Sequence, residues 1–216
     1  MPYKYETQHS TPSSAFTQGR PGAPTEVVIH HYGPDDATYE SSIAWLTRRD
    51  AVTSAHYVVD AGRVACIVDP DDTAWHSGSW PVNQRAIGIE NHPVWTQARE
   101  DTLVELCVAL ERQYGSLNYS VHQNHSSTAC PGRWVSRVPA IIDRINAQLA
   151  HPAGTASSKP RGYVHTPGKK AYHTVKSGDT LAALGRYYGV SVPLVVKWNR
   201  LASADMIRVG DVLRVR

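Results

Sequence analysis

Two histidines and a cysteine from distant parts of the chain form the pattern with the clearest chemical meaning. His30 ends the apolar run of residues 27–29, and His122 lies eight positions before Cys130 in the segment VHQNHSSTACPG. Two imidazoles and one thiolate can hold Zn²⁺ on three sides and leave the fourth position for water, as catalytic zinc sites do. The trio therefore predicts Zn²⁺ as the cofactor and a hydrolase as the class of protein.

The three cysteines of the chain differ in their surroundings. They are too few and too unevenly placed for a disulfide framework, which fits a chain made in a reducing compartment. Cys66 lies in the strand-like run RVACIV, and Cys107 lies on the apolar face of an expected helix, so both are expected to be buried. Cys130 lies in a polar loop bounded by Gly and Pro, which favours a metal ligand over the alternative, a half-buried loop thiol.

The elements that must position these side chains follow from hydrophobic periodicity. Short runs rich in β-branched residues predict strands, and apolar residues three or four apart predict helices. Strands are expected at residues 26–30, 56–60, 63–68 and 86–90. Three helices are expected: one around residues 43–46, one that begins after a cap at Thr96, and one over residues 138–149. Residues 60–63, DAGR, predict a hairpin turn. The expected fold class is α/β, a mixed central sheet flanked by helices, with His30, Glu90 and the 122–130 loop at one edge.

The chain divides near residue 150 in both composition and charge. Residues 151–170 are rich in Gly, Pro, Ser and Lys and predict a flexible linker between residues 1–150 and 171–216. Residues 1–150 carry 11 basic and 16 acidic side chains, a net charge of 11 − 16 = −5, whereas residues 151–216 carry 11 and 3, a net charge of +8. A basic tail suggests an anionic partner. An anionic cell wall is favoured over nucleic acid, for which the sequence has no recognition motif.

Five short motifs together resemble those of one enzyme family. VVIHHYG, SAHYVVD, AWHSG, AIGIE and TACPG occur in the order and rough spacing of the zinc-dependent N-acetylmuramoyl-L-alanine amidases. Residues 25–147 resemble this family, which includes phage lysins, bacterial autolysins and recycling amidases and is related to the peptidoglycan-recognition proteins. The resemblance implies hydrolysis of the amide between N-acetylmuramic acid and L-alanine in peptidoglycan, with a muropeptide in the catalytic cleft.

The resemblance also implies which residues bind the metal. The family's first ligand matches His30 rather than His31, and side-chain alternation along the strand places these two on opposite faces. The second ligand matches His122, with His125 as the weaker alternative, and the third, which is Cys or Asp in the family, matches Cys130.

Two further residues match catalytic positions of the family. Glu90 in AIGIE stands where many of these amidases have a catalytic glutamate, and an acid at the end of an apolar strand suits a general base with a raised pKa. The alternative is a surface glutamate that caps the strand. Thr128 stands where relatives have Lys or Thr, and its hydroxyl can stabilise an oxyanion.

The remaining motif residues carry weaker expectations. Some relatives have a catalytic Tyr at the position of Ala55, so proton transfer is assigned to Glu90. His56 is either an orienting residue beside the substrate site or a core histidine, and these alternatives stay open. Trp75 and His76 of AWHSG resemble cleft residues that meet the peptide stem, although His76 has the alternative of an ordinary turn histidine.

Residues 171–215 resemble a LysM domain over nearly its full length, which implies a βααβ fold that binds glycan containing N-acetylglucosamine. TVKSGDTL is expected to contain the first strand and a helix cap at Asp179 or Thr180, and IRVGDVLRV the last strand. The family's groove implies a set of binding residues, of which Leu181 and Val209 have the alternative of core positions: Gly178, Asp179, Thr180, Leu181, Ile207, Arg208 and Val209.

The two halves agree on peptidoglycan as substrate, so the expected protein is a phage endolysin, with a bacterial autolysin or a non-catalytic binder as alternatives. The polar start lacks a secretory signal, and the longest apolar runs are too short to cross a bilayer. We therefore expect a monomer, made in the host cytoplasm and acting on the cell wall, with no nucleic acid partner and no membrane insertion. A recycling amidase, which acts on soluble muropeptides, would have little use for a LysM domain.

Overall fold

The computed structural model describes residues 3–150, 172–176, 179–188, 190, 192–201 and 207–215. The chain forms two compact units, Met1–Gly154 and Thr155–Arg216. The predicted linker, residues 151–170, lies outside the described residues.

The first unit is built on a six-stranded mixed sheet with strand order β1-β5-β4-β7-β3-β8. Only the β4–β5 pair is antiparallel; every other pair in this sheet is parallel. A separate antiparallel pair joins β2 to β6. The strands are β1 (Lys4–Glu6), β2 (Phe16–Thr17), β3 (Glu26–His31), β4 (Tyr57–Asp60), β5 (Arg63–Cys66), β6 (Thr73–Ala74), β7 (Ala86–Asn91) and β8 (Asn118–Val121).

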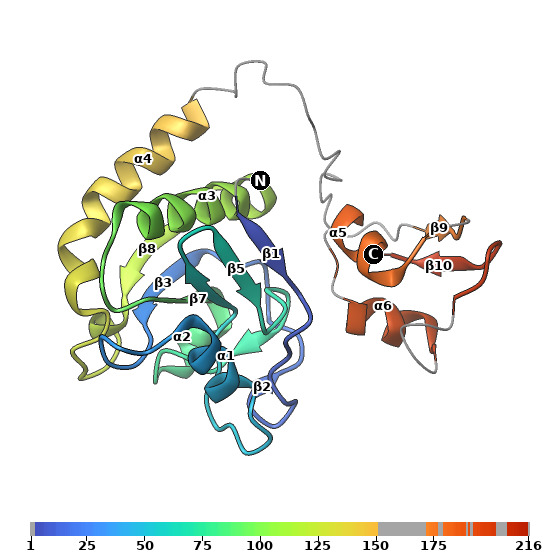
Figure 1. Ribbon diagram of the computed structural model, residues 1–216, viewed down its shortest axis with the longest axis horizontal. Helices are drawn as coiled ribbons and strands as arrows, with labels where there is room; N and C mark the ends of the chain where they lie inside the picture. The colour runs from blue at the N-terminus through green and yellow to red at the C-terminus, as the bar shows by residue number, and fades with distance from the viewer. Residues whose placement is uncertain are drawn as a thin grey trace. The chain divides into compact units, whose positions relative to one another are not determined.

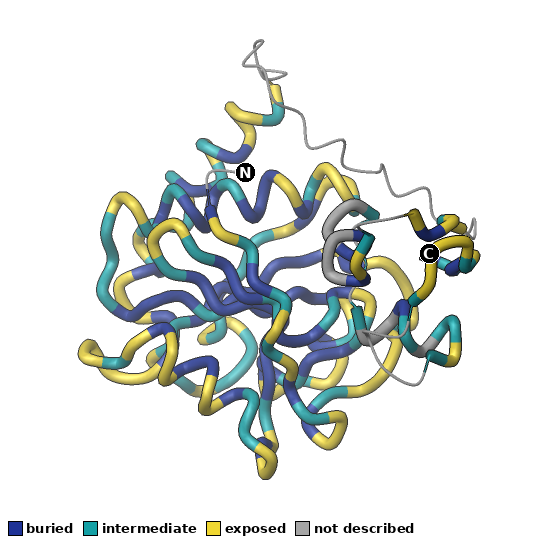
Figure 2. Tube along the Cα trace, turned by 45° about the vertical axis from the view of Figure 1, so that its right-hand side comes forward, coloured by how far each residue is buried: buried dark blue, intermediate teal, exposed yellow. Residues whose placement is uncertain are grey.

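Helices cover both faces of this sheet, as Figure 1 shows. The helical segments are α1 (Tyr39–Thr47), α2 (Trp80–Arg85), α3 (Gln97–Tyr114), α4 (Val138–Ala150) and the 3₁₀ turns η1 (His122–Asn124) and η2 (Gly132–Arg137). Alternating residues of β3 explain the two layers. Val27 and Ile29 pack with α3 and α4 in the larger core, whereas Val28 packs on the opposite face with Val82 of α2. The buried residues, dark blue in Figure 2, gather in the centre of this unit.

The predicted fold class is confirmed, because the sheet is mixed and flanked by helices. The four predicted strands are present, and the DAGR turn joins β4 to β5 as an antiparallel hairpin in which Asp60 pairs with Arg63. Thr96 caps α3 by accepting a hydrogen bond from the Arg99 N–H. The sequence did not predict β1, β2, β6, β8 or α2.

The second unit has the predicted βααβ order. Strand β9 (Tyr172–Thr174) pairs antiparallel with β10 (Val212–Arg214), and helices α5 (Leu181–Tyr188) and α6 (Val192–Asn199) lie between them in the chain. A small apolar core includes Leu181, Leu184 and Val195. None of the helices in the described parts of either unit is long and apolar enough to cross a bilayer.

Candidate metal centre

Strand register brings the predicted ligands together at the carboxyl ends of three parallel strands. His30 near the end of β3 is level with Glu90 of β7, and Ile29 is level with Val121, the last residue of β8. His122 therefore begins η1 beside the end of β3. Ligand atoms of His30, His122 and Cys130 all lie within 4.8 Å of one another.

The protonation chemistry of the three side chains suits a divalent cation. Burial first, and then the neighbouring imidazoles, keep the pKa of His30 well below its ordinary value, so the ring is neutral and has a lone pair to share. Burial and the nearby Glu90 carboxylate raise the pKa of the Cys130 thiol to about 12. A thiolate at this position therefore needs a positive charge beside it, and two imidazoles with one thiolate form a donor set typical of zinc.

Glu90 lies beside the first of these ligands. Its Oε1 is 4.0 Å from Nδ1 of His30, and its Oε2 is buried without a hydrogen-bond partner in the described structure. Burial raises the pKa of this carboxyl group to about 8. Glu90 is thus a largely buried acid that faces the ligand group, rather than the surface glutamate of the alternative interpretation.

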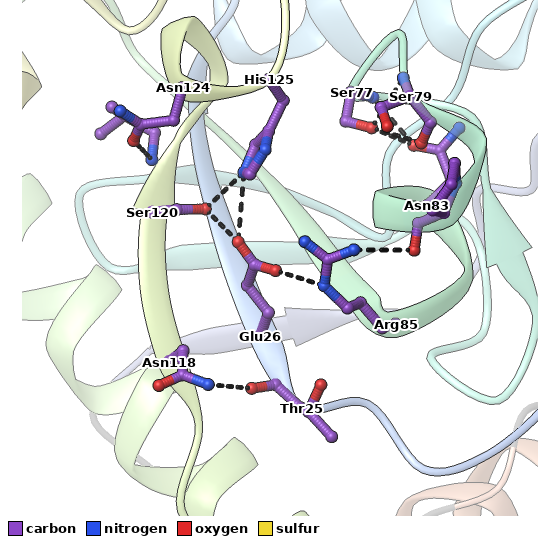
Figure 3. Close-up of polar contacts among 12 residues, drawn as sticks. Thr25, Glu26, Ser77, Ser79, Asn83, Arg85, Asn118, Ser120, Asn124 and His125 are labelled. Atoms are coloured by element: carbon purple, nitrogen blue, oxygen red, sulfur yellow. Dashed lines mark hydrogen bonds and ion pairs between the residues drawn. The ribbon is translucent and has the colours of Figure 1, made fainter.

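The other residues of the ligand loop have structural partners. The Thr128 hydroxyl accepts a hydrogen bond from the Cys130 N–H at 3.2 Å, which leaves its own hydrogen to donate elsewhere. His125 is not part of the ligand group. Its Nε2 lies 3.1 Å from Glu26 and 2.8 Å from Ser120. Figure 3 draws both contacts as dashed lines.

His31 contacts the site through its backbone. Its N–H donates to Cys130 Sγ at 3.3 Å, while its imidazole is not part of the ligand group. The strand alternation that separated His30 from His31 in the sequence is therefore present in the structure.

His56 lies in the buried interior of the first unit. It is fully buried, its Nδ1 accepts a hydrogen bond from the Gly88 N–H at 2.9 Å, and its Nε2 faces the Asp72 carbonyl oxygen at 3.2 Å. This placement matches the core alternative. Trp75 is half-buried, and its indole N–H donates to Thr17.

His76 has a partner that the sequence did not indicate. The residue is 6% exposed, and its Nδ1 lies 3.0 Å from Nε2 of His30. Asn83, which no sequence pattern singled out, accepts hydrogen bonds from the backbone N–H groups of His76 and Ser77. A lone Asn in a six-residue helix gives no signal that would have identified it.

The predicted glycan-binding residues of the second unit fall into different environments, and Gly178 lies outside the described residues. Leu181 is 2% exposed and belongs to the core, whereas Val209 is 70% exposed, so the core alternative holds for the first and not for the second. Ile207 packs against that core.

The polar members of this set make local contacts. The Asp179 carboxylate accepts hydrogen bonds from the Lys176 N–H and interacts with His173 at 2.7 Å. The backbone carbonyl of Thr180 accepts from the Leu184 N–H, so Thr180 immediately precedes α5 as a cap residue does. The N–H of Arg208, whose side chain is exposed, donates to the Asp211 carboxylate.

Comparison with known proteins gives related sequences over most of the chain. N-acetylmuramoyl-L-alanine amidase XlyB of Bacillus subtilis is 27% identical over 207 residues, which are 88% of this chain and 62% of the relative. N-acetylmuramoyl-L-alanine amidase XlyA of the same organism is 26% identical over 212 residues, 91% of this chain and 63% of the relative. The chain thus spans less than two thirds of the length of these relatives.

Solved structures share the fold of the first unit. The catalytic domain of XlyA superposes with a TM-score of 0.58 at 18% identity, covering 66% of this chain and 99% of that domain. PlyL superposes with a TM-score of 0.56 at 20% identity, covering 66% of this chain and 96% of that chain.

Family models match both parts of the chain. Residues 173–216 match the LysM domain. Residues 19–133, more than half of the chain and including all three converging side chains, match the N-acetylmuramoyl-L-alanine amidase model. The chain therefore belongs to the N-acetylmuramoyl-L-alanine amidase family and carries a LysM domain after the amidase region.

Proposed function

We propose that this protein hydrolyses the amide bond between N-acetylmuramic acid and L-alanine in peptidoglycan, with Zn²⁺ held by His30, His122 and Cys130. The convergence of these three side chains next to a buried carboxyl group carries the proposal. Two neutral imidazoles and a thiol that requires a nearby cation fit this metal better than an oxygen-preferring one.

Zn²⁺ at this position would polarise the scissile carbonyl and acidify a water molecule. Glu90 takes the proton from the attacking water and later delivers it to the departing alanine nitrogen. Burial raises the pKa of this carboxyl group above its ordinary value, and an acid with a raised pKa suits a group that both accepts and delivers a proton. The Thr128 hydroxyl donates to the carbonyl oxygen as negative charge develops there.

The second unit binds the glycan that surrounds the cleavage site. Its match to the LysM domain supports recognition of the N-acetylglucosamine-containing backbone, while the muropeptide occupies the first unit. The net charge of +8 in residues 151–216 adds attraction to anionic wall polymers. The biological setting we propose is that of a monomeric phage endolysin acting on the host cell wall.

The test is digestion of purified sacculi followed by mass spectrometry, with metal analysis of the same protein. We expect about one equivalent of zinc, new alanine amino termini and free lactyl carboxyl groups on muramic acid. A chelator should abolish these products, and added Zn²⁺ should restore them. New glycan reducing ends, or cleavage that resists the chelator, would contradict the proposal.

Cysteine variants provide a matched control. Cys130→Ala should lose both zinc and activity because it removes a ligand. Cys66→Ala alters a half-buried cysteine outside the ligand group and should retain both. Peptidoglycan binding without cleavage by the zinc-loaded protein would instead favour the non-catalytic binder.

A further inference from the structure

One short turn contacts both histidines of the ligand group. The turn comprises residues 75–79 and connects β6 to α2. The His76 ring meets the His30 ring at 3.0 Å between Nδ1 and Nε2. The backbone of Ser77, in the same turn, lies beside the His122 ring.

The contact between His30 and His76 determines which nitrogen of His30 carries the proton. Nδ1 of His30 faces Cys130 Sγ at 3.8 Å and Glu90 at 4.0 Å, so Nδ1 is the atom directed to the metal position. A neutral imidazole has one N–H, which must then be on Nε2, where it donates to Nδ1 of His76. Hydrogen bonds of this kind fix both the tautomer and the orientation of a metal-binding ring.

Asn83 holds this turn from within α2. Its Oδ1 accepts hydrogen bonds from the His76 N–H at 3.3 Å, the Ser77 N–H at 2.9 Å and the Ser77 hydroxyl at 2.7 Å. Figure 3 shows Asn83 close to Ser77 and Ser79, at the right of the view. One buried side-chain oxygen therefore organises the backbone that carries both contacts to the ligands.

Gly88 provides the space that the His76 ring occupies. This residue of β7 is level with Val28 and two positions before Glu90. A Cβ atom at Gly88 would lie 2.5 Å from Cγ of His76, well inside van der Waals contact. The ring thus packs directly on the bare backbone of β7, which fixes its distance from His30.

We propose that His76 and Asn83 are positioning residues of the metal centre: His76 orients His30, and Asn83 holds the turn that orients both histidines. This inference rests on the proposed function, because it takes His30 and His122 as metal ligands. It differs from the peptide contact expected for His76, whose ring is almost wholly enclosed by protein.

The test measures Zn²⁺ affinity of the full chain by competition with a chelating dye, with the Co²⁺ absorption spectrum as a second readout. Asn83→Leu removes the acceptor, whereas Asn83→Asp retains an oxygen for the same three donors. We expect Asn83→Leu to weaken Zn²⁺ binding by about 10- to 100-fold and to alter the Co²⁺ spectrum, and Asn83→Asp to restore most of the affinity. Asn118→Leu, at an exposed asparagine, is the control.

Two variants of His76 provide an independent test. His76→Asn places an acceptor near the position of Nδ1, and His76→Leu does not, so only the leucine variant should lose affinity. Thermal unfolding of the metal-free proteins will show whether Asn83→Leu folds. If it does not fold, the two His76 variants test the inference. Native affinity in both leucine variants, or equal losses in the leucine variants and their polar partners, would overturn the inference.

The outcomes separate this inference from the proposed function. If the wild-type protein binds Zn²⁺ but cleaves another bond, the proposed function fails and the affinity comparison still tests the positioning residues. If the wild-type protein cleaves the expected amide and both leucine variants bind Zn²⁺ normally, only the positioning role fails. Absence of Zn²⁺ binding by the wild-type protein contradicts both.

Discussion

Replacement of Glu100 by Gln should destabilise the first unit strongly although the residue lies outside the ligand group. Glu100 is fully buried in the first turn of α3, and its carboxylate accepts hydrogen bonds from Arg137, Arg144 and the Trp95 indole, at 2.7 to 3.2 Å. These bonds connect α3 to η2 and α4. A glutamine removes the charge and turns an N–H group toward these donors.

The size of the effect follows from burial. Breaking a buried ion pair costs about 3–5 kcal/mol, but Arg137 and Arg144 are about one third exposed and can regain water. We therefore expect a loss of about 3 kcal/mol, or a fall in Tm of about 6–12 °C for a unit of this size. Asp101→Asn is the matched control, because Asp101 shares Arg144 but is about half exposed, so its loss should stay below about 1 kcal/mol.

The sign of the pH dependence gives a second readout. Burial alone would raise the pKa of Glu100, but the hydrogen bonds from Arg137, Trp95 and Arg144 outweigh it and lower the pKa below its ordinary value. The stabilisation is therefore fully present at neutral pH and is lost as the pH falls through the folded-state pKa. Urea unfolding should show a gap between wild type and Glu100→Gln that narrows toward pH 3. A gap that is constant with pH, or no larger than that of the control, would refute this reasoning.

Three further predictions concern function and the second unit. Glu90→Gln should reduce turnover by about 10²- to 10⁴-fold while zinc content stays at the wild-type level, measured by product release and metal analysis; unchanged turnover would remove Glu90 from proton transfer. Deletion of 155–216 should weaken pelleting with intact walls but spare cleavage of soluble fragments, and equal losses in both assays would contradict separate roles. His173→Leu should lower the Tm of the LysM unit, because His173 bridges Asp179 and the Tyr188 hydroxyl at 2.7 and 2.8 Å; calorimetry showing no change would contradict this.

Short apolar runs were the strongest source of correct structural predictions. The runs of β3 and β7 predicted strands with His30 and Glu90 at their carboxyl ends, and therefore the approach of these two residues at one edge of the sheet. Helix α3 was equally clear because its apolar residues recur after a capping Thr96.

Elements with weak periodicity were missed. Strand β8 is a short edge strand with the mixed sequence NYSV, and α2 has only six residues, one of which is Pro81. Both are nevertheless essential to the centre, since β8 leads into His122 and α2 carries Asn83. Short elements stabilised mainly by tertiary contacts have little local signal for a sequence to display.

The contacts around His76 depend on strand register, which local pattern does not specify. The motif AWHSG indicated a functional segment but not the direction of its imidazole. That direction follows from the bare Gly88 backbone of β7, on which the ring packs, and this contact is formed between segments distant in sequence. His56 illustrates the same limit, since its hydrogen bond to Gly88 distinguishes a core role from a cleft role.

The register of β3, β7 and β8 has a consequence for redesign. The spacing of both imidazoles and the acid is maintained by interstrand hydrogen bonding in the middle of the sheet. The loop of residues 32–38, which leaves β3 toward α1, lies outside these paired strands. Substitutions at exposed positions of this loop, such as Pro34 and Asp36, should therefore leave the spacing of the ligand group intact.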